Sequence, residues 1–433
     1  MTGTPILGDI STRLQRIAQL AREDPQRAFL SLAHHIDIDL LHEAFRRTRK
    51  DGAVGVDGQT GREYEEHLWD NLRDLLDRFK SGRYKAPPVR RTYIPKGDGE
   101  ATRPIGIPTF EDKVLQRAVA MVLEAIYEED FWDFSYGFRP GRSAHNALSA
   151  LWKGLMDRGG GWILDVDIKG FFDTISHRQL RSFLHQRVRD GVLRRTIDKW
   201  LAAGVMEGAT IRHPDTGTPQ GGVISPLLAN IYLYEVVDQW FERDVKPRCC
   251  RAFMIRYADD MVMIFANEAD AREAKDLLAR RLEQYGLSLH PTKTRLVKCY
   301  PWAGGPGSTP GSFDFLGFTH FWARSLRGSW VVKRKTAASR FRRTLKRLAV
   351  WCRRNRHRPV AWQHARIVMG LCGHYNYYGI TGNWRSLASL RHEVERIWRK
   401  WLNRRSQGNH MPWSRFAQLL ERHPMPRPSI CTR

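Results

Sequence analysis

The spacing of apolar and polar residues predicts a mostly helical start to the chain, followed by a mixed helical and extended region. Residues 1 to about 85 have helical spacing, interrupted by the turn-rich stretch 52–58. Between Glu111 and Glu129, apolar side chains recur at the spacing of an amphipathic helix, at Val114, Leu115, Ala118, Val119, Val122 and Ile126. We therefore expect a long helix here that packs one face against a core.

Three extended runs are predicted between residues 85 and 175. Arg90–Lys96 and Arg103–Pro108 flank a glycine-containing turn and predict a β-hairpin that carries basic side chains. Trp162–Ile168 follows three glycines and predicts a further strand. Asp173 comes shortly after this strand, where we expect it to be the N-cap of the next helix.

The tetrapeptide Tyr257-Ala258-Asp259-Asp260 lies between the apolar runs Ala252–Ile255 and Met261–Phe265. The pattern predicts a β-hairpin with two adjacent carboxylates at its turn. Like charges near a buried strand are costly unless a cation pairs with them, which suggests a divalent-metal site. The alternative is an ordinary hairpin, because Asp is a common turn residue.

A two-metal site for phosphoryl transfer needs carboxylates from more than one strand, because one hairpin cannot surround two ions. Asp167, near the end of its predicted strand, is the natural partner for Asp259 and Asp260. Asp165 points to the same face under the two-residue period of a strand. The sequence therefore leaves Asp165 open as a further ligand.

Positive charge is concentrated in the last quarter of the chain. The 433 residues carry a formal charge of +25, and residues 321–433 contain 26 Lys and Arg against three acids, which is +23. Such an excess repels itself without a polyanion partner and indicates nucleic-acid binding. Eight of the fifteen tryptophans lie in the same segment. They either stack on nucleic acid or pack in a helical core, and helical spacing favours packing.

The remaining composition is that of an ordinary folded protein, with 42% hydrophobic and 27% charged residues. Neither a signal-peptide core nor an apolar run of about 18 residues occurs, so we expect no membrane association and an intracellular location. The six cysteines form no Cys-x-x-Cys pair, which predicts reduced thiols rather than a zinc finger or a disulfide framework.

Eight sequence blocks in order resemble those of group II intron reverse transcriptases. They are Tyr93–Lys96, Arg103–Pro108, Ser135–Ser143, Asp167–Asp173, Thr218–Pro226, Tyr257–Asp260, Leu289–Thr294 and Phe315–Phe318. The resemblance implies an α+β fold, a right-hand polymerase with fingers and an antiparallel-sheet palm, followed by an α-helical basic thumb, or maturase, domain. It implies a helical N-terminal extension at 1–69, fingers and palm at 70–320, and a thumb with a short DNA-binding tail at 321–433.

The resemblance implies that Asp167, Asp259 and Asp260 bind two Mg²⁺ ions, with the Ile168 backbone carbonyl as a further ligand. Hard oxygen ligands suit this ion. Lys293 resembles the lysine that protonates pyrophosphate as a general acid.

The resemblance also implies a binding site for the incoming deoxynucleoside triphosphate. Lys96 and Arg103 match the fingers residues that grip the triphosphate, although their spacing differs from the family pattern by one residue. Phe172 matches an aromatic gate that crowds a ribose 2′-hydroxyl, and its alternative is a core phenylalanine. Gln220, followed by two glycines, matches a loop at the nascent base pair, where glycine allows close backbone approach.

Three functions fit these features. The first is an intron-encoded RNA-directed DNA polymerase that binds its intron RNA, assists splicing and copies it into DNA during retrohoming, using DNA primer or target, RNA template and dNTPs. The second is a related polymerase that serves DNA repair or phage defence, and the third is a splicing factor on an inactive polymerase fold. The chain resembles the compact branch without an endonuclease domain, and we expect a cytoplasmic, nucleoid-associated bacterial protein.

Overall fold

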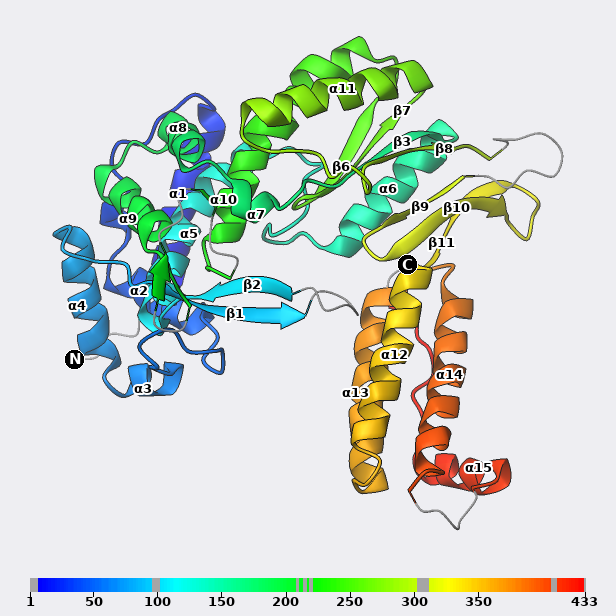
Figure 1. Cartoon of the computed structure of the whole chain (residues 1–433). Helices are drawn as coiled ribbons and strands as arrows, with labels where there is room; N and C mark the ends of the chain where they lie inside the picture. Colours follow the sequence, from blue (N-terminus) through cyan, green and yellow to red (C-terminus); the bar gives the residue numbers. More distant parts are fainter. Residues whose placement is uncertain are drawn as a thin grey trace. The chain divides into compact units, whose positions relative to one another are not determined.

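The computed structural model describes residues 7–95, 102–207, 210–212, 216–217, 221–301, 311–405 and 411–431. The chain divides into two compact units, each described below by itself. The first comprises Met1–Ala150 and Leu164–Leu296, and the second comprises Leu151–Ile163 and Val297–Arg433 (Figure 1).

Helices α1 and α2 pack against the long helix α5 in the first unit. The predicted helix therefore forms, but α5 is buried on most sides, including the polar residues Asp112 and Gln116. The helices up to the connection into the second unit are α1 (Leu7–Glu23), α2 (Ile38–Arg47), α3 (Gly61–Glu66), α4 (Leu68–Lys80), α5 (Phe110–Asp130) and α6 (Ala144–Arg158). Those that follow are α7 (Phe171–Thr174), α8 (His177–Arg187), α9 (Gly191–Ala202), α10 (Ser225–Leu233) and α11 (Glu268–Gln284).

Two four-stranded sheets carry the candidate site residues. One has the order β2-β1-β4-β5 and is built from β1 (Val89–Pro95), β2 (Thr102–Ile107), β4 (Val205–Glu207) and β5 (Thr210–Arg212). Strands β1 and β2 form the predicted antiparallel hairpin, drawn in cyan in Figure 1. The other has the order β6-β7-β3-β8 and is built from β3 (Gly161–Val166), β6 (Phe253–Tyr257), β7 (Asp260–Phe265) and β8 (Arg295–Cys299).

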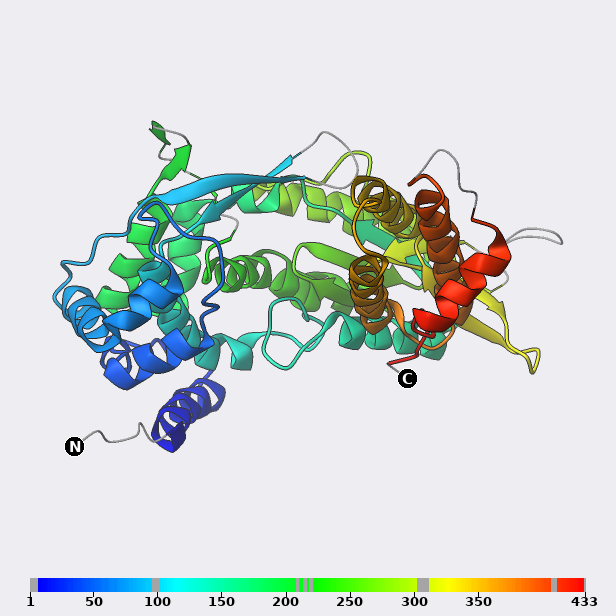
Figure 2. The same ribbon diagram turned by 90° about the horizontal axis from the view of Figure 1, so that it is seen from below.

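The second unit combines a three-stranded antiparallel sheet with a helical bundle. The sheet has the order β11-β10-β9, from β9 (Ser312–Phe315), β10 (Phe318–Arg324) and β11 (Trp330–Thr336). The bundle contains α12 (Ala338–Arg354), α13 (Val360–Tyr378), α14 (Trp384–Leu402) and α15 (Trp413–Arg422). Figure 2 shows α12, α13 and α14 almost end-on, side by side. Mixed helices and sheets with a helical C-terminal region confirm the predicted α+β class.

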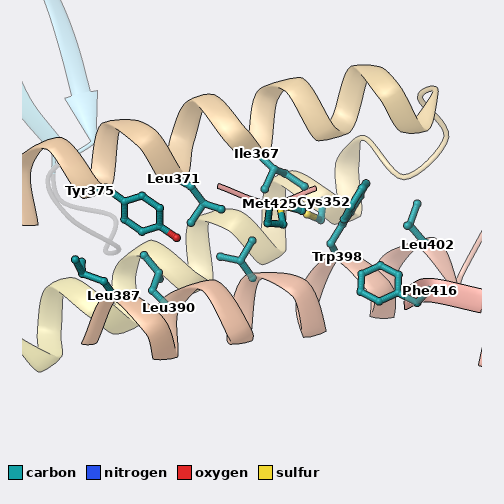
Figure 3. Packing of buried hydrophobic residues seen from close by; sticks show 11 residues of the cluster. Cys352, Ile367, Leu371, Tyr375, Leu387, Leu390, Trp398, Leu402, Phe416 and Met425 are labelled. Atoms are coloured by element: carbon teal, nitrogen blue, oxygen red, sulfur yellow. The ribbon is translucent and has the colours of Figure 1, made fainter. Parts of the chain in front are cut away.

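Apolar side chains from all four bundle helices meet in one core (Figure 3). Trp398 is fully buried in this core, and its indole nitrogen donates a 3.0 Å hydrogen bond to Gln363. The prediction that the tryptophans of this segment are packing groups holds for Trp322 and Trp398. It is wrong for Trp362, Trp384 and Trp413, which are 38%, 51% and 52% exposed. All six cysteines are free thiols.

Candidate active site

The turn between β6 and β7 presents the two adjacent carboxylates. The strands pair up to Tyr257 and Asp260, which leaves Ala258 and Asp259 as a two-residue turn. Ala258 has φ of 57°, a left-handed conformation that costs about 1–2 kcal/mol for a residue with a Cβ. Asp259 is half-buried and Asp260 is exposed. The predicted hairpin therefore forms with a strained, acidic turn.

A buried polar network holds this turn from behind. Arg256 is fully buried and forms an ion pair with the equally buried Asp238, with 2.7 Å between Nε and Oδ1. Its Nη1 donates to the Asn230 side chain at 3.0 Å and to the Ala258 carbonyl at 3.2 Å. Because these donors reach the strained residue itself, the network stabilises the conformation of the turn.

The segment 134–137 lies beside β6 and extends its hydrogen bonding. Arg256 N donates to Phe134 O at 2.9 Å, and Tyr136 N donates to Arg256 O at 2.8 Å. A Cβ on Gly137 would lie 2.2 Å from the Ala258 amide nitrogen, so only glycine fits there. The sequence pattern alone does not indicate this positioning role for Gly137; the glycine within the Ser135–Ser143 block is the available signal.

Asp167 follows β3 directly, because the strand ends at Val166, two residues earlier than predicted. His290 N donates to the Asp167 carbonyl at 2.7 Å, and Lys169 N donates to Ser288 O at 2.9 Å. These two hydrogen bonds form an isolated antiparallel bridge between Ile168 and Leu289. Both bonds are made by backbone groups of the adjacent residues, so the bridge does not use the Ile168 carbonyl. Lys293 Nζ lies 3.2 Å from Asp167 Oδ2. The structure thus brings the predicted general acid and the first predicted metal ligand together.

Asp165 has a different partner from Asp167. Its carboxylate accepts a 3.1 Å hydrogen bond from Arg295 Nη2 and is mostly buried. The charge of Asp167 is one of the groups that raise the pKa of Asp259. Asp165 stays an open alternative as a further ligand.

The electrostatics of Asp259 connect three separate parts of the chain. Burial raises the pKa of the Asp259 carboxyl above its usual value. Its own backbone amide and the positive charge of Arg103 on β2 oppose this shift, while the negative charge of Asp167 adds to it. No group of three or more His, Cys, Asp or Glu side chains in the described part of the chain is arranged to hold a metal ion as it stands. Of the three aspartates expected to cluster, Asp167 acts electrostatically on Asp259, and Asp260 is exposed next to Asp259 in the sequence.

Phe172 lies in the short helix α7 and is half-buried, with its ring packed edge-on against Phe171 at 5.3 Å. Phe171 is the residue in the core, 2% exposed. The prediction that Asp173 caps the following helix is wrong, because Asp173 is inside α7 and Ser176 is the N-cap of α8. A Ser-His start to α8 provides this cap one turn later.

Two predicted nucleotide contacts, Lys96 and Gln220, lie outside the described residues. Next to Gln220, Gly221 has φ of 116°, and a Cβ there would lie 2.5 Å from the Gly106 carbonyl on β2. The backbone at Gly221 thus lies close to β2 of the protein itself, where glycine is needed. Gln116 of α5 fixes the loop further, accepting a 2.8 Å hydrogen bond from Val223 N.

Comparison with known protein families identifies the class of protein. Residues 94–320, more than half of the chain, match the family described as reverse transcriptase (RNA-dependent DNA polymerase). The chain belongs to this family. The match covers β2, Asp167, the β6–β7 turn and Lys293. No helix of the described residues is long and apolar enough to cross a lipid bilayer.

Curated relatives confirm the resemblance to group II intron proteins. The Group II intron-encoded protein LtrA of Lactococcus lactis subsp. cremoris is 37% identical over 224 residues, 52% of this chain and 37% of that protein. Protein YkfC of Escherichia coli (strain K12) is 38% identical over 241 residues, 54% of this chain and 63% of YkfC. Nuclear intron maturase 2, mitochondrial, of Arabidopsis thaliana is 30% identical over 220 residues, 40% of this chain and 30% of the maturase. This chain spans less than two thirds of the length of each.

Proposed function

We propose that this protein is an RNA-directed DNA polymerase that serves a group II intron. One observation carries the proposal. Asp259, on a strained turn, lies within electrostatic reach of Asp167 and Arg103, so two acids and one base converge from the β6–β7 turn, the residue after β3, and β2. Packing alone gives no reason to bring like charges together at a half-buried position. Nucleotidyl transfer needs such a set of groups, because it proceeds mainly by positioning and by charge stabilisation.

The donor set fits Mg²⁺. Every proposed ligand is an oxygen, from Asp167, Asp259, Asp260 and the Ile168 carbonyl, and hard oxygen ligands suit this ion. Among the described residues Asp259 has no ion-pair partner, although burial disfavours its charge. When bound, two Mg²⁺ ions would lower the charge barrier between the primer hydroxyl and the triphosphate. Asp260 is exposed and follows Asp259 directly in the chain.

In the proposed reaction the primer 3′-oxygen forms a bond to the α-phosphorus of the incoming nucleotide while the bond to pyrophosphate breaks. Lys96 and Arg103 bind the triphosphate, as a point charge and a two-pronged donor respectively. Lys293, which shares a hydrogen bond with Asp167, donates its proton to the departing pyrophosphate. Phe172 excludes the 2′-hydroxyl of a ribonucleotide, and Gln220 contacts the nascent base pair.

The intron role rests on the relatives and on the distribution of charge. Two of the relatives named above are an intron-encoded protein and an intron maturase. The +23 of residues 321–433 suits binding to folded RNA, which we propose is the intron that this protein helps to splice and then copies into DNA during retrohoming. The domain boundaries proposed from the sequence, 1–69, 70–320 and 321–433, are kept as functional divisions.

Asp165 in β3 and Asp167 just after its end provide a matched test. Asp167→Asn should abolish primer extension on an RNA template, whereas Asp165→Asn, which alters the contact with Arg295, should retain most of it. Asp259→Ala combined with Asp260→Ala should also abolish extension while RNA affinity stays nearly intact. The assigned site would be refuted if the Asp167 variant or the Asp259/Asp260 double variant still extended a primer. Equal loss of primer extension in the Asp165 and Asp167 variants would refute it as well.

A second experiment separates splicing from polymerisation. The Asp167→Asn protein, mixed with the group II intron RNA that flanks its coding frame, should still promote splicing at low magnesium concentration, because RNA binding does not use this carboxylate. Failure of wild-type protein to bind or splice such an RNA, with polymerase activity intact, would remove the intron role and leave the polymerase.

A further inference from the structure

The turn between α12 and α13, residues 355–359, is unusually well fixed for an exposed loop. The buried side chain of Gln363 donates from Nε2 to the carbonyls of Asn355, Arg356 and Arg358, at 2.9, 3.2 and 2.9 Å. Arg405 of the segment after α14 also donates to Arg356 O, at 2.6 Å. With its carbonyls held inward, the turn presents its side chains outward in a defined arrangement.

Two stacked tryptophans lie beside this turn. The rings of Trp351 on α12 and Trp362 on α13 are 5.7 Å apart and nearly parallel, at 16°. Trp362 is 38% exposed, and the guanidinium groups of Arg358 and Arg366 both lie 5.7 Å from its ring centre. A core tryptophan of the same bundle, Trp398, is by contrast fully buried (Figure 3). Trp362 is therefore a partly exposed surface platform, whereas Trp351, which stacks on it, also packs against the bundle core.

The platform is surrounded by uncompensated positive charge. Arg353, Arg354, Arg356 and Arg358 are all exposed, and no Asp or Glu occurs in the sequence between Asp314 and Glu393. Among residues that the structure describes, none of these four arginines forms an ion pair with a carboxylate. Guanidinium groups this close repel one another, so the turn is expected to be more stable with a polyanion bound.

We propose that the α12–α13 turn, with Trp351 and Trp362, is a binding site for unpaired nucleotides of a folded RNA. One base stacks on the exposed ring of Trp362, and Arg358 and Arg366 bind the flanking phosphates. Stacking requires a base that is free of its own duplex partner, and such bases are common in the loops and bulges of RNA. Arginine supplies both the planar stacking surface and the phosphate donors.

This site goes beyond the proposed polymerase site. It rests on the proposed function only in that both expect an RNA partner, and none of its residues is among those assigned to nucleotide transfer. A stacking site binds only bases that are unpaired, so it would distinguish single-stranded segments of an intron from its helices. The surrounding basic surface, by contrast, binds the phosphates of single-stranded and of double-stranded RNA.

The test compares two probes with the full-length protein, a short unstructured oligoadenylate RNA and a blunt RNA duplex of the same length. Trp362→Ala should weaken binding of the single strand at least about fivefold, since one base stack contributes on the order of 1–3 kcal/mol. The duplex affinity should change less than about twofold. Trp362→Phe, which retains a ring, should recover most of the loss, and thermal unfolding identifies any variant that fails to fold.

Trp384 and a second pair of arginines are the matched controls. Trp384 is more exposed than Trp362, at 51%, and Trp384→Ala should leave both affinities unchanged. Arg358→Gln with Arg366→Gln should reduce the slope of log affinity against log salt by about 1.4 for the single strand. The same change in charge at Arg385 and Arg427 should reduce it less.

Equal losses for the two probes, or equal effects of Trp362→Ala and Trp384→Ala, would overturn the stacking site. No loss at Trp362 would overturn it as well. Primer extension by the wild-type protein is a separate measurement, so failure of the polymerase function and failure of this site are distinguishable.

Discussion

The buried ion pair between Arg256 and Asp238 provides a sharp test of how the acidic turn is held. Both side chains are fully buried, and Arg256 also donates to Asn230 and to the carbonyl of the strained residue Ala258. Arg256→Met removes the cation and leaves Asp238 buried without a partner. Removing one member of such a pair costs about 3–5 kcal/mol, which we expect as the loss in free energy of unfolding by urea.

The double variant Arg256→Met with Asp238→Leu separates stability from positioning. Removing both charges eliminates the unpaired buried charge, so we expect recovery of at least about 2 kcal/mol relative to the single variant. Primer extension should not recover, because the Ala258 carbonyl and Asn230 still lack their donor. If the double variant polymerises like wild type, or if Arg256→Met is as stable as wild type, the network does not hold the turn.

Arg187→Met is a suitable control. Arg187 forms a comparably buried ion pair with Asp130, with 2.9 Å between Nε and Oδ2, and donates to three carbonyls of the N-terminal region. None of these partners belongs to the hairpin turn. Its loss should lower the free energy of unfolding by a similar amount while the activity per folded molecule stays unchanged.

Three further predictions follow from single positions. Gly137→Ala puts a Cβ 2.2 Å from the Ala258 amide nitrogen and should lower the rate of primer extension; a rate equal to wild type would show that the turn can shift freely. Phe172→Ala should raise incorporation of ribonucleotides relative to deoxynucleotides in single-nucleotide extension, and unchanged selectivity would remove its role as a gate. Burial raises the pKa of Asp112 to about 7, above the unfolded value of 3.8, so its contribution to stability is present below about pH 4 and lost as the pH rises through 7. Asp112→Asn should flatten this dependence and be up to about 4 kcal/mol more stable than wild type at pH 8 in urea unfolding, whereas an unchanged pH profile would contradict the burial effect.

Local pattern was sufficient for the elements that carry the chemistry. The β1–β2 and β6–β7 hairpins form where alternation and turn residues predict them, and Asp167 acts on Asp259 as expected from the need for two strands. The burial of α5 on most sides could not be predicted in this way, because α1 and α2 reach it from distant positions in the chain.

The residues that hold the acidic turn in place were harder to predict from the sequence than the aspartates themselves. Arg256 is one of many arginines in the sequence, and its partner Asp238 lies 18 residues away in the helical segment after α10. Nothing in the spacing distinguishes this pair from two surface charges. The tryptophans show the same limit, because helical spacing is similar for Trp398 in the core and Trp362 at the surface. Burial depends on which face a neighbouring helix covers.

The near absence of acidic residues from the basic segment has a consequence for movement along a template. A surface that binds phosphates through charge alone holds a nucleic acid with similar free energy at each successive nucleotide. The free energy of binding then changes little when the nucleic acid moves by one nucleotide. Tight binding therefore does not create a barrier to translocation. Raising the salt concentration should accordingly shorten the time that the proposed polymerase stays on its template more than it slows each step.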